Sequence, residues 1–244
     1  DFIQIPTSLL AQVDSSIGGK TGVDFSSYKN MVGAFHMPRL VYMNVDTLTT
    51  LSDRQFVSGL GEIIKHGLIK DREYFDWLVS HFKEIINRDK TILTEMVIKS
   101  CDIKRRVVEE DPTEQGDRAL LNFGHTLGHA IEKMLNFSYL HGECVAIGSI
   151  LSSIMSYNMG LISREDLDKI IQLFNDFGFP PLPEDLNINE MISITKSDKK
   201  MHSGKIKFIL IKSIGDAYID STITDAHMES AVRDLYATYN HEIH

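Results

Sequence analysis

The sequence predicts an α+β protein: a mostly helical domain spans about residues 51–244, and residues 1–50 form the last strands of an α/β domain. Residues 2–5 and 40–45 are short apolar runs typical of strands, and the stretch between them is rich in Gly and Ser. After residue 51, apolar residues recur every three or four positions, which indicates amphipathic helices. Because the chain begins with what reads as a strand already in progress, we expect it to be a piece of a longer protein.

Composition limits the functions that this chain can have. Its 244 residues are 43% hydrophobic and 24% charged, which is typical of a globular protein and excludes collagen-like and disordered classes. The 25 Lys and Arg against 34 Asp and Glu give a net charge of −9, so we expect no binding to nucleic acid or to anionic membranes. The longest apolar run, residues 144–155, is shorter than the roughly 20 residues that span a bilayer. Cys101 and Cys144 form no CxxC pair, so we expect a reducing, cytoplasmic location.

The individual elements follow from local sequence. Residues 2–5 and 40–45 predict strands, and the glycine-rich stretch between them predicts a loop. A helix begins after Ser52, a plausible N-cap, and carries on one face Phe56, Leu60, Ile63, Ile64 and Leu68. Periodicity then predicts helices at about 72–87, 89–110, 119–136, 141–159, 163–177 and 187–195. Two strands, 206–214 and 218–223, precede a closing helix that starts at Asp225.

The densest group of candidate ligands is the segment LNFGHTLGHA, followed by HGE. His125 and His129 are four residues apart on a predicted helix, so both imidazoles project from one face with the spacing of paired metal ligands. The Glu that follows the first His in zinc proteases is absent, and the third imidazole, His141, begins the next predicted helix. Two His and one carboxylate around an open position form a catalytic zinc pattern. The alternative is three ordinary histidines near a helical turn.

Glu62, in the segment GLGEIIKH, is the candidate carboxylate. Helical spacing places it beside Gly59 and His66. The alternative is a solvent-facing Glu that pairs with Lys65, three residues later. Spacing alone leaves both interpretations open.

The segment DSSIGGKTG ends like a phosphate-binding P-loop but lacks the first glycine of that motif, because Asp14 stands there. What remains is a glycine-rich loop with backbone N–H groups, an acid and Lys20, which could hold an anion or the polar groups of a cofactor. A plain surface turn is the alternative. Lys29 and Asn30 add a second cation and an amide nearby. Further basic groups, which could serve an anionic ligand or be solvated helix faces, are residues 104–106, Arg118 and residues 196–200.

Longer motifs in the chain resemble the 3-dehydroquinate synthase family. They run almost end to end: IPTSLLAQVDSSIGGKTGVD, KNMVGAFHMPRLV, SGLGEIIKHGLI, SCDIKRRVVEEDPTEQGDRALLNFGHTLGHAIE, LHGECVAIG and SDKKMHSGKIKFILI. The resemblance implies an N-terminal NAD-binding α/β domain, of which residues 1–50 are the last strands, and a helical, metal- and substrate-binding domain in residues 51–244. It also implies that the glycine-rich nucleotide turn lies upstream of Asp1, so we expect this chain alone to be inactive.

The resemblance also implies a set of metal ligands that differs from the pair of His125 and His129. It implies zinc, or cobalt, held by Glu62, His125 and His141, with His129 beside the metal. Such a site leaves positions for two vicinal substrate hydroxyls and lowers their pKa. The implied reaction converts 3-deoxy-D-arabino-heptulosonate 7-phosphate, a small anionic sugar phosphate, to 3-dehydroquinate and phosphate. This is a step of the shikimate pathway toward aromatic amino acids, and it uses NAD transiently.

Matching the family motifs position by position implies the roles of individual side chains. The implied substrate-contacting and catalytic residues are Lys65, Lys104, Arg118, Asn122, His129, Lys20, Asn30 and Lys200. The implied cofactor-binding residues are Thr7, Ser8, Leu10, Asp14, Lys20, Lys29, Asn30, Thr50, Leu51 and Gln55. Family members are usually homodimers, so we expect a homodimer.

Three alternatives compete with this interpretation. The first is another sugar-phosphate cyclase, such as 2-deoxy-scyllo-inosose synthase, but Lys104 and Asn122 before the GHTLGH motif favour the dehydroquinate enzyme. The second is a metal-dependent glycerol or alcohol dehydrogenase, which shares the fold but not the DSSIGGKTG and KN motifs. The third is a catalytically inactive metal-binding fragment.

Overall fold

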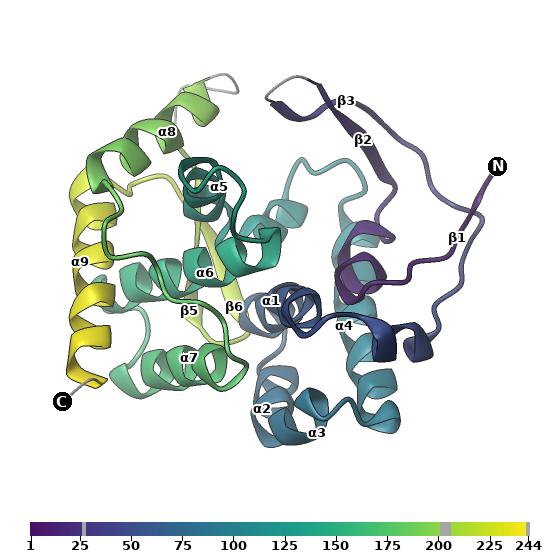
Figure 1. The fold of residues 1–244 in the computed structure, drawn as a ribbon. Coiled ribbons are helices and arrows are strands. Elements are labelled where there is room, and N and C mark those ends of the chain that lie inside the picture. The colour runs from purple at the N-terminus through teal and green to yellow at the C-terminus, as the bar shows by residue number, and fades with distance from the viewer. Residues whose placement is uncertain (26–27, 201–205, 243–244) are drawn as a thin grey trace.

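Helix α6, His141–Asn158, runs through the centre of the molecule (Figure 1). The computed structural model describes residues 1–25, 28–200 and 206–242, with side chains described there except at 23–32, 198–200 and 240–242. Every residue of α6 from Gly142 to Ser156 is buried, because the helix carries small and apolar side chains almost all round. It packs against α1 (Asp53–Lys70), α5 (His125–Met134), α7 (Arg164–Asp176) and α9 (Asp225–Glu242).

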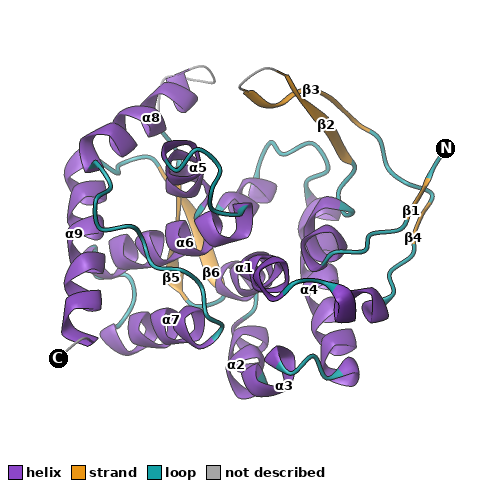
Figure 2. Cartoon of the chain, in the orientation of Figure 1, coloured by secondary structure: helices purple, strands orange, loops and turns teal. Residues whose placement is uncertain are grey.

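The other helices and a hairpin form a shell around this centre (Figure 2). Helix α4 (Lys90–Glu110) packs on α1, beside the short helices α2 (Arg72–Ser80) and α3 (Phe82–Ile86), and α8 (Ile188–Lys200) packs on α5 and α9. The antiparallel strands β5 (Phe208–Ser213) and β6 (Asp216–Asp220) lie against α6 and α1 respectively. No helix in the described residues has both the length and the apolar character needed to cross a lipid bilayer.

The N-terminal segment forms two small strand pairs outside the helical shell. Strands β1 (Ile3–Gln4) and β4 (Leu40–Val41) are parallel, with Ile3 opposite Leu40. A π-helical turn, Ala11–Ser15, and the antiparallel hairpin of β2 (Lys20–Phe25) and β3 (Tyr28–Phe35) lie between them, and a 3-10 helix, Val45–Thr50, leads into α1. The parallel pair is the arrangement expected for the end of an α/β sheet.

The glycine-rich stretch is a hairpin, so the expectation of a loop was wrong. Gly22 pairs with Gly33 across the two strands, and a Cβ atom on Gly33 would lie only 2.1 Å from the backbone oxygen of Thr21. Gly22 and Gly33 therefore serve close cross-strand approach, whereas Gly18 and Gly19, with φ of +100° and +64°, form the turn that precedes β2.

Two predicted helices are each divided in two. The helix expected at 72–87 breaks at His81, between α2 and α3, and the one expected at 119–136 breaks at Phe123 and Gly124. Gly124 has a φ of +76°, in the left-handed region that a continuous helix cannot contain, so a 3-10 helix, Asp117–Asn122, ends there and α5 begins. Helix α8 extends to Lys200, beyond the expected end at 195. The remaining predicted helices and strands are confirmed within a few residues.

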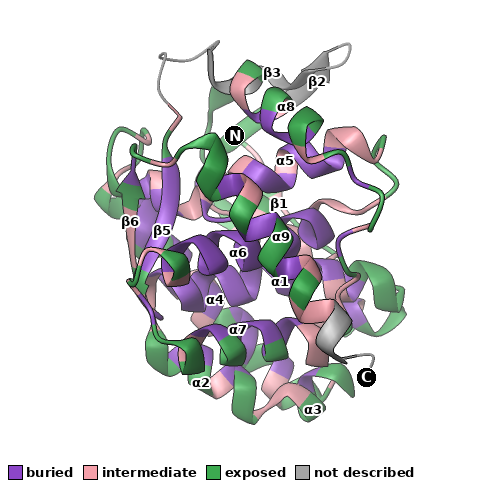
Figure 3. Ribbon diagram, turned by 90° about the vertical axis from the view of Figure 1, so that its left-hand side faces the viewer, coloured by how far each residue is buried: buried purple, intermediate pink, exposed green. Residues whose placement is uncertain are grey.

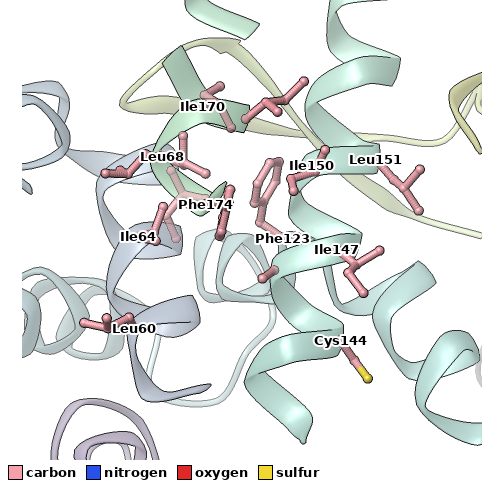
Figure 4. Close-up of a cluster of buried hydrophobic side chains, with 14 of the residues drawn as sticks. Leu60, Ile64, Leu68, Phe123, Cys144, Ile147, Ile150, Leu151, Ile170 and Phe174 are labelled. Atoms are coloured by element: carbon pink, nitrogen blue, oxygen red, sulfur yellow. The ribbon is translucent and has the colours of Figure 1, made fainter. Parts of the chain in front are cut away.

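A single apolar core joins these elements and fixes their relative positions. Figure 4 shows Ile64 of α1, Phe174 of α7 and Phe123 in the space between α1 and α6. The other core residues labelled there are Leu60, Leu68, Cys144, Ile147, Ile150, Leu151 and Ile170. In Figure 3 the buried residues follow α6 and β5 through the interior. Because interiors are close-packed, α1 and α6 form a rigid base for any side chain that they carry.

An ion pair ties the start of α6 to the start of α1. Glu143 is buried, and its two oxygens accept hydrogen bonds of 2.7 Å from Nε and Nη2 of Arg54. The same carboxylate accepts a 2.6 Å hydrogen bond from the backbone N–H of Leu140, and Arg54 also donates to the carbonyl of Ser138 at 2.7 Å. This bidentate pair fixes the N-terminus of α6, where His141 lies.

We expect Arg54→Ala to lower the free energy of unfolding clearly, because it leaves the buried Glu143 carboxylate with one charged partner fewer. Urea denaturation followed by circular dichroism measures this change. Arg105→Ala is the matched control, since Arg105 pairs with Asp102 and Glu109 on an exposed helix face, and its loss should change the urea midpoint much less. Equal losses in the two variants would contradict the role assigned to the buried pair.

Candidate metal centre and anion cleft

Glu62 of α1 is the buried acid at the centre of the candidate site. Its side chain is fully buried, so the alternative of a solvent-facing Glu is wrong. Its Oε1 atom lies 3.4 Å from Nε2 of His125 and 3.5 Å from Nε2 of His141, and its other oxygen forms an ion pair with Lys65. Burial raises the pKa of Glu62, but the charge of Lys65 and the contacts with His125 outweigh burial and hold that pKa well below its usual range.

Three imidazoles converge where α5 meets the start of α6. Nitrogen atoms of His125, His129 and His141 all lie within 4.8 Å of one another. Their ring centroids are 5.2 Å apart for His125 and His129, 5.4 Å for His125 and His141, and 5.7 Å for His129 and His141. The i,i+4 pair predicted on one helix face is therefore confirmed, and the third imidazole joins it from the next helix.

Contacts at Nδ1 orient two of these rings. His125 donates from Nδ1 to the carbonyl oxygen of Phe123 at 3.0 Å, and Nδ1 of His141 lies 3.8 Å from a carboxylate oxygen of Glu132. Such partners on one ring nitrogen are typical of histidines whose other nitrogen binds a metal. Burial lowers the pKa of His141, but Glu132 and Glu62 raise it to about 9. Both rings therefore present Nε2 toward the Glu62 carboxylate.

The donor set fits a divalent transition metal in either of two ways. His125 and His141 are common to both, and the third ligand is the carboxylate of Glu62 or the imidazole of His129. Within the described part of the chain, neither oxygen of Glu62 has a hydrogen-bond partner of good geometry. A buried carboxylate whose Oε1 atom lacks a hydrogen bond and faces two imidazoles suits a cation that all three groups share.

A cleft of about 590 Å³ opens over this centre. Its lining combines the three histidines of α5 and α6 with four cationic side chains. The rest of the lining comes from the hairpin β2–β3, the π-helical turn, α1, α4 and the segment before α5. The predicted site residues that line it are Asp14, Lys20, Lys65, Lys104, Arg118, Asn122, His125, His129 and His141. Four cations around one cavity of a protein with a net charge of −9 would favour an anionic ligand.

Lys104 and Arg118 already bind oxygen atoms of the protein. The Lys104 ammonium contacts the Asp14 carboxylate at 2.6 Å and the Asp14 carbonyl at 2.5 Å. Burial raises the pKa of Asp14, but the charge of Lys104 lowers it below its usual value overall. The buried guanidinium of Arg118 donates to the carbonyl oxygens of Gly18 at 2.8 Å and Pro112 at 2.7 Å, which joins two loops at the rim of the cleft.

Two acids near the site were not predicted from the sequence. Glu114 lines the cleft, forms an ion pair with Lys20 and accepts a 2.9 Å hydrogen bond from Asn122. It lies in a turn with a φ of +60°, and no sequence signal marks its approach to Lys20. Glu132, beside His141, was detectable in principle, because it follows His129 by three residues on one helix face.

The predicted cofactor residues outside the cleft flank the entry to α1. Of the predicted cofactor-binding residues whose side chains are described, six do not line the cleft: Thr7, Ser8, Leu10, Thr50, Leu51 and Gln55. The two segments that carry them meet through Gln12, whose amide donates to the carbonyl of Asn44 at 3.1 Å and to Thr47 Oγ1 at 3.3 Å. The predicted residues whose side chains lie outside the described part of the structure are Lys29, Asn30 and Lys200.

The sequence matches two profiles of one family. The profile described as 3-dehydroquinate synthase C-terminal matches residues 59–201, and the one described as 3-dehydroquinate synthase N-terminal matches residues 1–58. The 3-dehydroquinate synthase of Nitrosospira multiformis is 44% identical over 237 residues, which are 97% of this chain and 65% of that protein. The enzyme of the same name from Desulforamulus reducens is 45% identical over 227 residues, 92% of this chain and 63% of that protein. The chain thus spans less than two thirds of the length of these relatives.

Solved structures share the same fold. The 2-epi-5-epi-valiolone synthase of Streptomyces hygroscopicus subsp. jinggangensis, with NAD+ and Zn2+ bound, superposes with a TM-score of 0.91 at 28% identity, covering 97% of this chain and 66% of that one. A 2-deoxy-scyllo-inosose synthase complexed with carbaglucose-6-phosphate, NAD+ and Co2+ gives a TM-score of 0.84 at 24% identity, with 95% and 66% coverage. The second likeness concerns the fold alone. Both confirm a mostly helical domain preceded by a short strand-containing segment.

We expect Lys104→Met to lower the free energy of unfolding by about 2 kcal/mol, because it leaves the Asp14 carboxylate without its cation. Combining it with Asp14→Asn should recover part of the loss, with a coupling energy of about 0.5–3 kcal/mol in a double-mutant cycle. Urea denaturation of the four proteins gives the cycle. Strictly additive single effects would show that the two side chains do not stabilise one another.

Proposed function

Since this chain belongs to the 3-dehydroquinate synthase family, we propose that the full-length protein is a phosphate-eliminating lyase of aromatic amino acid biosynthesis. Its substrate would be 3-deoxy-D-arabino-heptulosonate 7-phosphate, and its products 3-dehydroquinate and phosphate. The identity of 44–45% to curated relatives supports this reaction. The homodimer, as the resemblance implies, and the cytoplasmic location, as the cysteine pattern indicates, stay predictions.

We infer that the metal ligands are Glu62, His125 and His141. The observation that carries this proposal is the position of the Glu62 carboxylate, whose Oε1 atom faces Nε2 of both histidines at 3.4 and 3.5 Å. The Nδ1 contacts of His125 and His141 support it, because they direct Nε2 of each ring toward the same oxygen. His129 then remains beside the centre, where it can contact substrate. Zinc or cobalt suits this mixture of nitrogen and oxygen ligands.

The cations of the cleft would bind the two anionic groups of the substrate. When bound, a divalent metal polarises adjacent hydroxyl groups and NAD accepts and returns a hydride, which is the chemistry that this reaction requires. Lys104 and Arg118 offer charge-assisted hydrogen bonds for a carboxylate or phosphate. Lys65, next to Glu62, and Lys20, across the cleft, add positive charge on either side, and Asn122 adds an amide donor.

The NAD site would lie at the N-terminal edge of the cleft. Thr7, Ser8, Leu10, Thr50, Leu51 and Gln55 are the residues proposed to line it, together with Asp14, Lys20, Lys29 and Asn30. Support comes from the hydrogen bonds of Gln12, which bring the segment after β1 and the segment before α1 together. Lys200 is proposed to reach the substrate from the end of α8.

A related sugar-phosphate cyclase is the second candidate function. The TM-score of 0.91 to 2-epi-5-epi-valiolone synthase supports a shared fold, but the identity to that protein is 28%, against 44% to a 3-dehydroquinate synthase. The higher identity supports the dehydroquinate reaction over other cyclisations, as do Lys104 and Asn122 through the family motifs.

We predict that Glu62→Gln and His141→Ala weaken zinc binding by at least roughly 100-fold, beyond the roughly 10- to 100-fold typical of residues that only orient a ligand. His129→Ala should retain zinc and lose turnover. Chelator competition gives the zinc affinity of each variant. His227→Ala is the matched control, since His227 is exposed at the start of α9 and should retain zinc fully. Retention of zinc by Glu62→Gln together with loss of zinc by His129→Ala would instead identify the three histidines as the ligands.

We predict that the full-length protein, supplied with NAD and zinc, releases inorganic phosphate from 3-deoxy-D-arabino-heptulosonate 7-phosphate and shows no cyclisation of glucose 6-phosphate. The 244-residue chain tested alone should be inactive. A coupled phosphate assay with both substrates distinguishes the cyclases. Turnover of glucose 6-phosphate alone, or of neither substrate, would overturn the proposed reaction.

A further inference from the structure

We propose that Gly61, Gly142 and Gly128 are positioning residues, which set the geometry of the metal centre by letting the backbones of α1, α5 and α6 touch. The inference rests on the proposed metal site. Each candidate ligand is next in sequence to a glycine: Glu62 follows Gly61, His141 precedes Gly142, and the two histidines of α5 follow Gly124 and Gly128.

The contact between α1 and α6 leaves no space for a methyl group. A Cβ atom on Gly142 would lie 1.8 Å from the backbone oxygen of Ser58, and one on Gly61 would lie 2.6 Å from the backbone oxygen of Gly142. The backbone N–H of Gly142 also donates to Ser58 Oγ at 3.2 Å. Real Cβ atoms essentially never come within 3.0 Å of such atoms, so a side chain at either position requires the helices to separate.

The contact between α5 and α6 is equally close. A Cβ atom on Gly128 would lie 2.8 Å from the backbone oxygen of Cys144, and one on Gly148 would lie 1.9 Å from the backbone oxygen of Gly124. The opposing atoms belong to the backbone, so no change of rotamer relieves these overlaps. Helix α6 is therefore held by glycine contacts against both of the helices that bring ligands to it.

These contacts decide the geometry of the site because its ligands lie at the points of contact. Glu62 and His141 are each one residue away from a glycine at which α1 meets α6. A separation of the two helices would therefore move these ligands by almost the same distance. Metal and catalytic constellations tolerate displacements of about 0.5 Å. Since alanine favours helix more than glycine does, local propensity does not explain glycine at position 61 within α1.

The test is cobalt binding by Gly61→Ala in the full-length protein, with Co2+ alone as the probe. We expect a roughly 10- to 100-fold weaker Kd for Co2+, as when other groups that orient a ligand are removed, and a changed visible absorption spectrum of the bound ion. Gly128→Ala gives the same test on α5 if Gly61→Ala does not fold. The unfolding midpoint of each metal-free protein reports stability separately.

Gly67→Ala is the matched control on the same helix. A Cβ atom there would lie 3.1 Å from Cβ of Phe75, a strained contact with α2 that is remote from the ligands. We expect it to change the unfolding midpoint while the Kd and the spectrum of Co2+ stay as in the wild type. The inference fails if Gly61→Ala binds Co2+ with the wild-type Kd and spectrum, or if Gly67→Ala weakens binding equally. Absence of Co2+ binding by the wild type would instead overturn the proposed metal site, and the inference with it.

Discussion

A negative charge enclosed in the protein interior is the constraint on which this structure depends. An ionised carboxylate removed from water costs several kcal/mol unless opposite charges or hydrogen-bond donors surround it. Glu62 meets this requirement with Lys65 on one oxygen and two imidazoles facing the other. The apolar core of α1 and α6 holds those partners in place, so packing and electrostatics act on the same few residues.

Cations that line the cleft above this centre already have partners within the protein. The cations Lys20, Lys104 and Arg118 are matched with carboxylate or carbonyl oxygens of the chain. An anionic ligand that entered the cleft would therefore have to replace these protein oxygens as the partner of each cation. Such an exchange lowers the net gain in binding energy and makes selectivity depend on how many of these donors a ligand can satisfy together.

Sequence periodicity predicted the helical domain well, because the apolar faces of its long helices repeat regularly. It did not predict the break at Gly124, whose positive φ depends on contacts with α6, or the hairpin between β1 and β4, whose glycines pair across strands. For the site, spacing identified His125 and His129, which are neighbours on one helix. Glu62 could not be distinguished from a surface acid by spacing, because only tertiary packing buries it, and its selection came from the family resemblance. Glu114 approaches the cleft through a turn, and no local signal marks that approach.

The origin of the proposed ligands on three separate helices has a thermodynamic consequence. The unfolded chain keeps only isolated histidines and acids, and it cannot offer the assembled set, so a metal ion binds the folded state preferentially. By mass action, an ion present at 100 times its Kd would add about 2.7 kcal/mol to the free energy of unfolding. Metal supply would in this way set the fraction of the chain that is folded as well as the occupancy of the site.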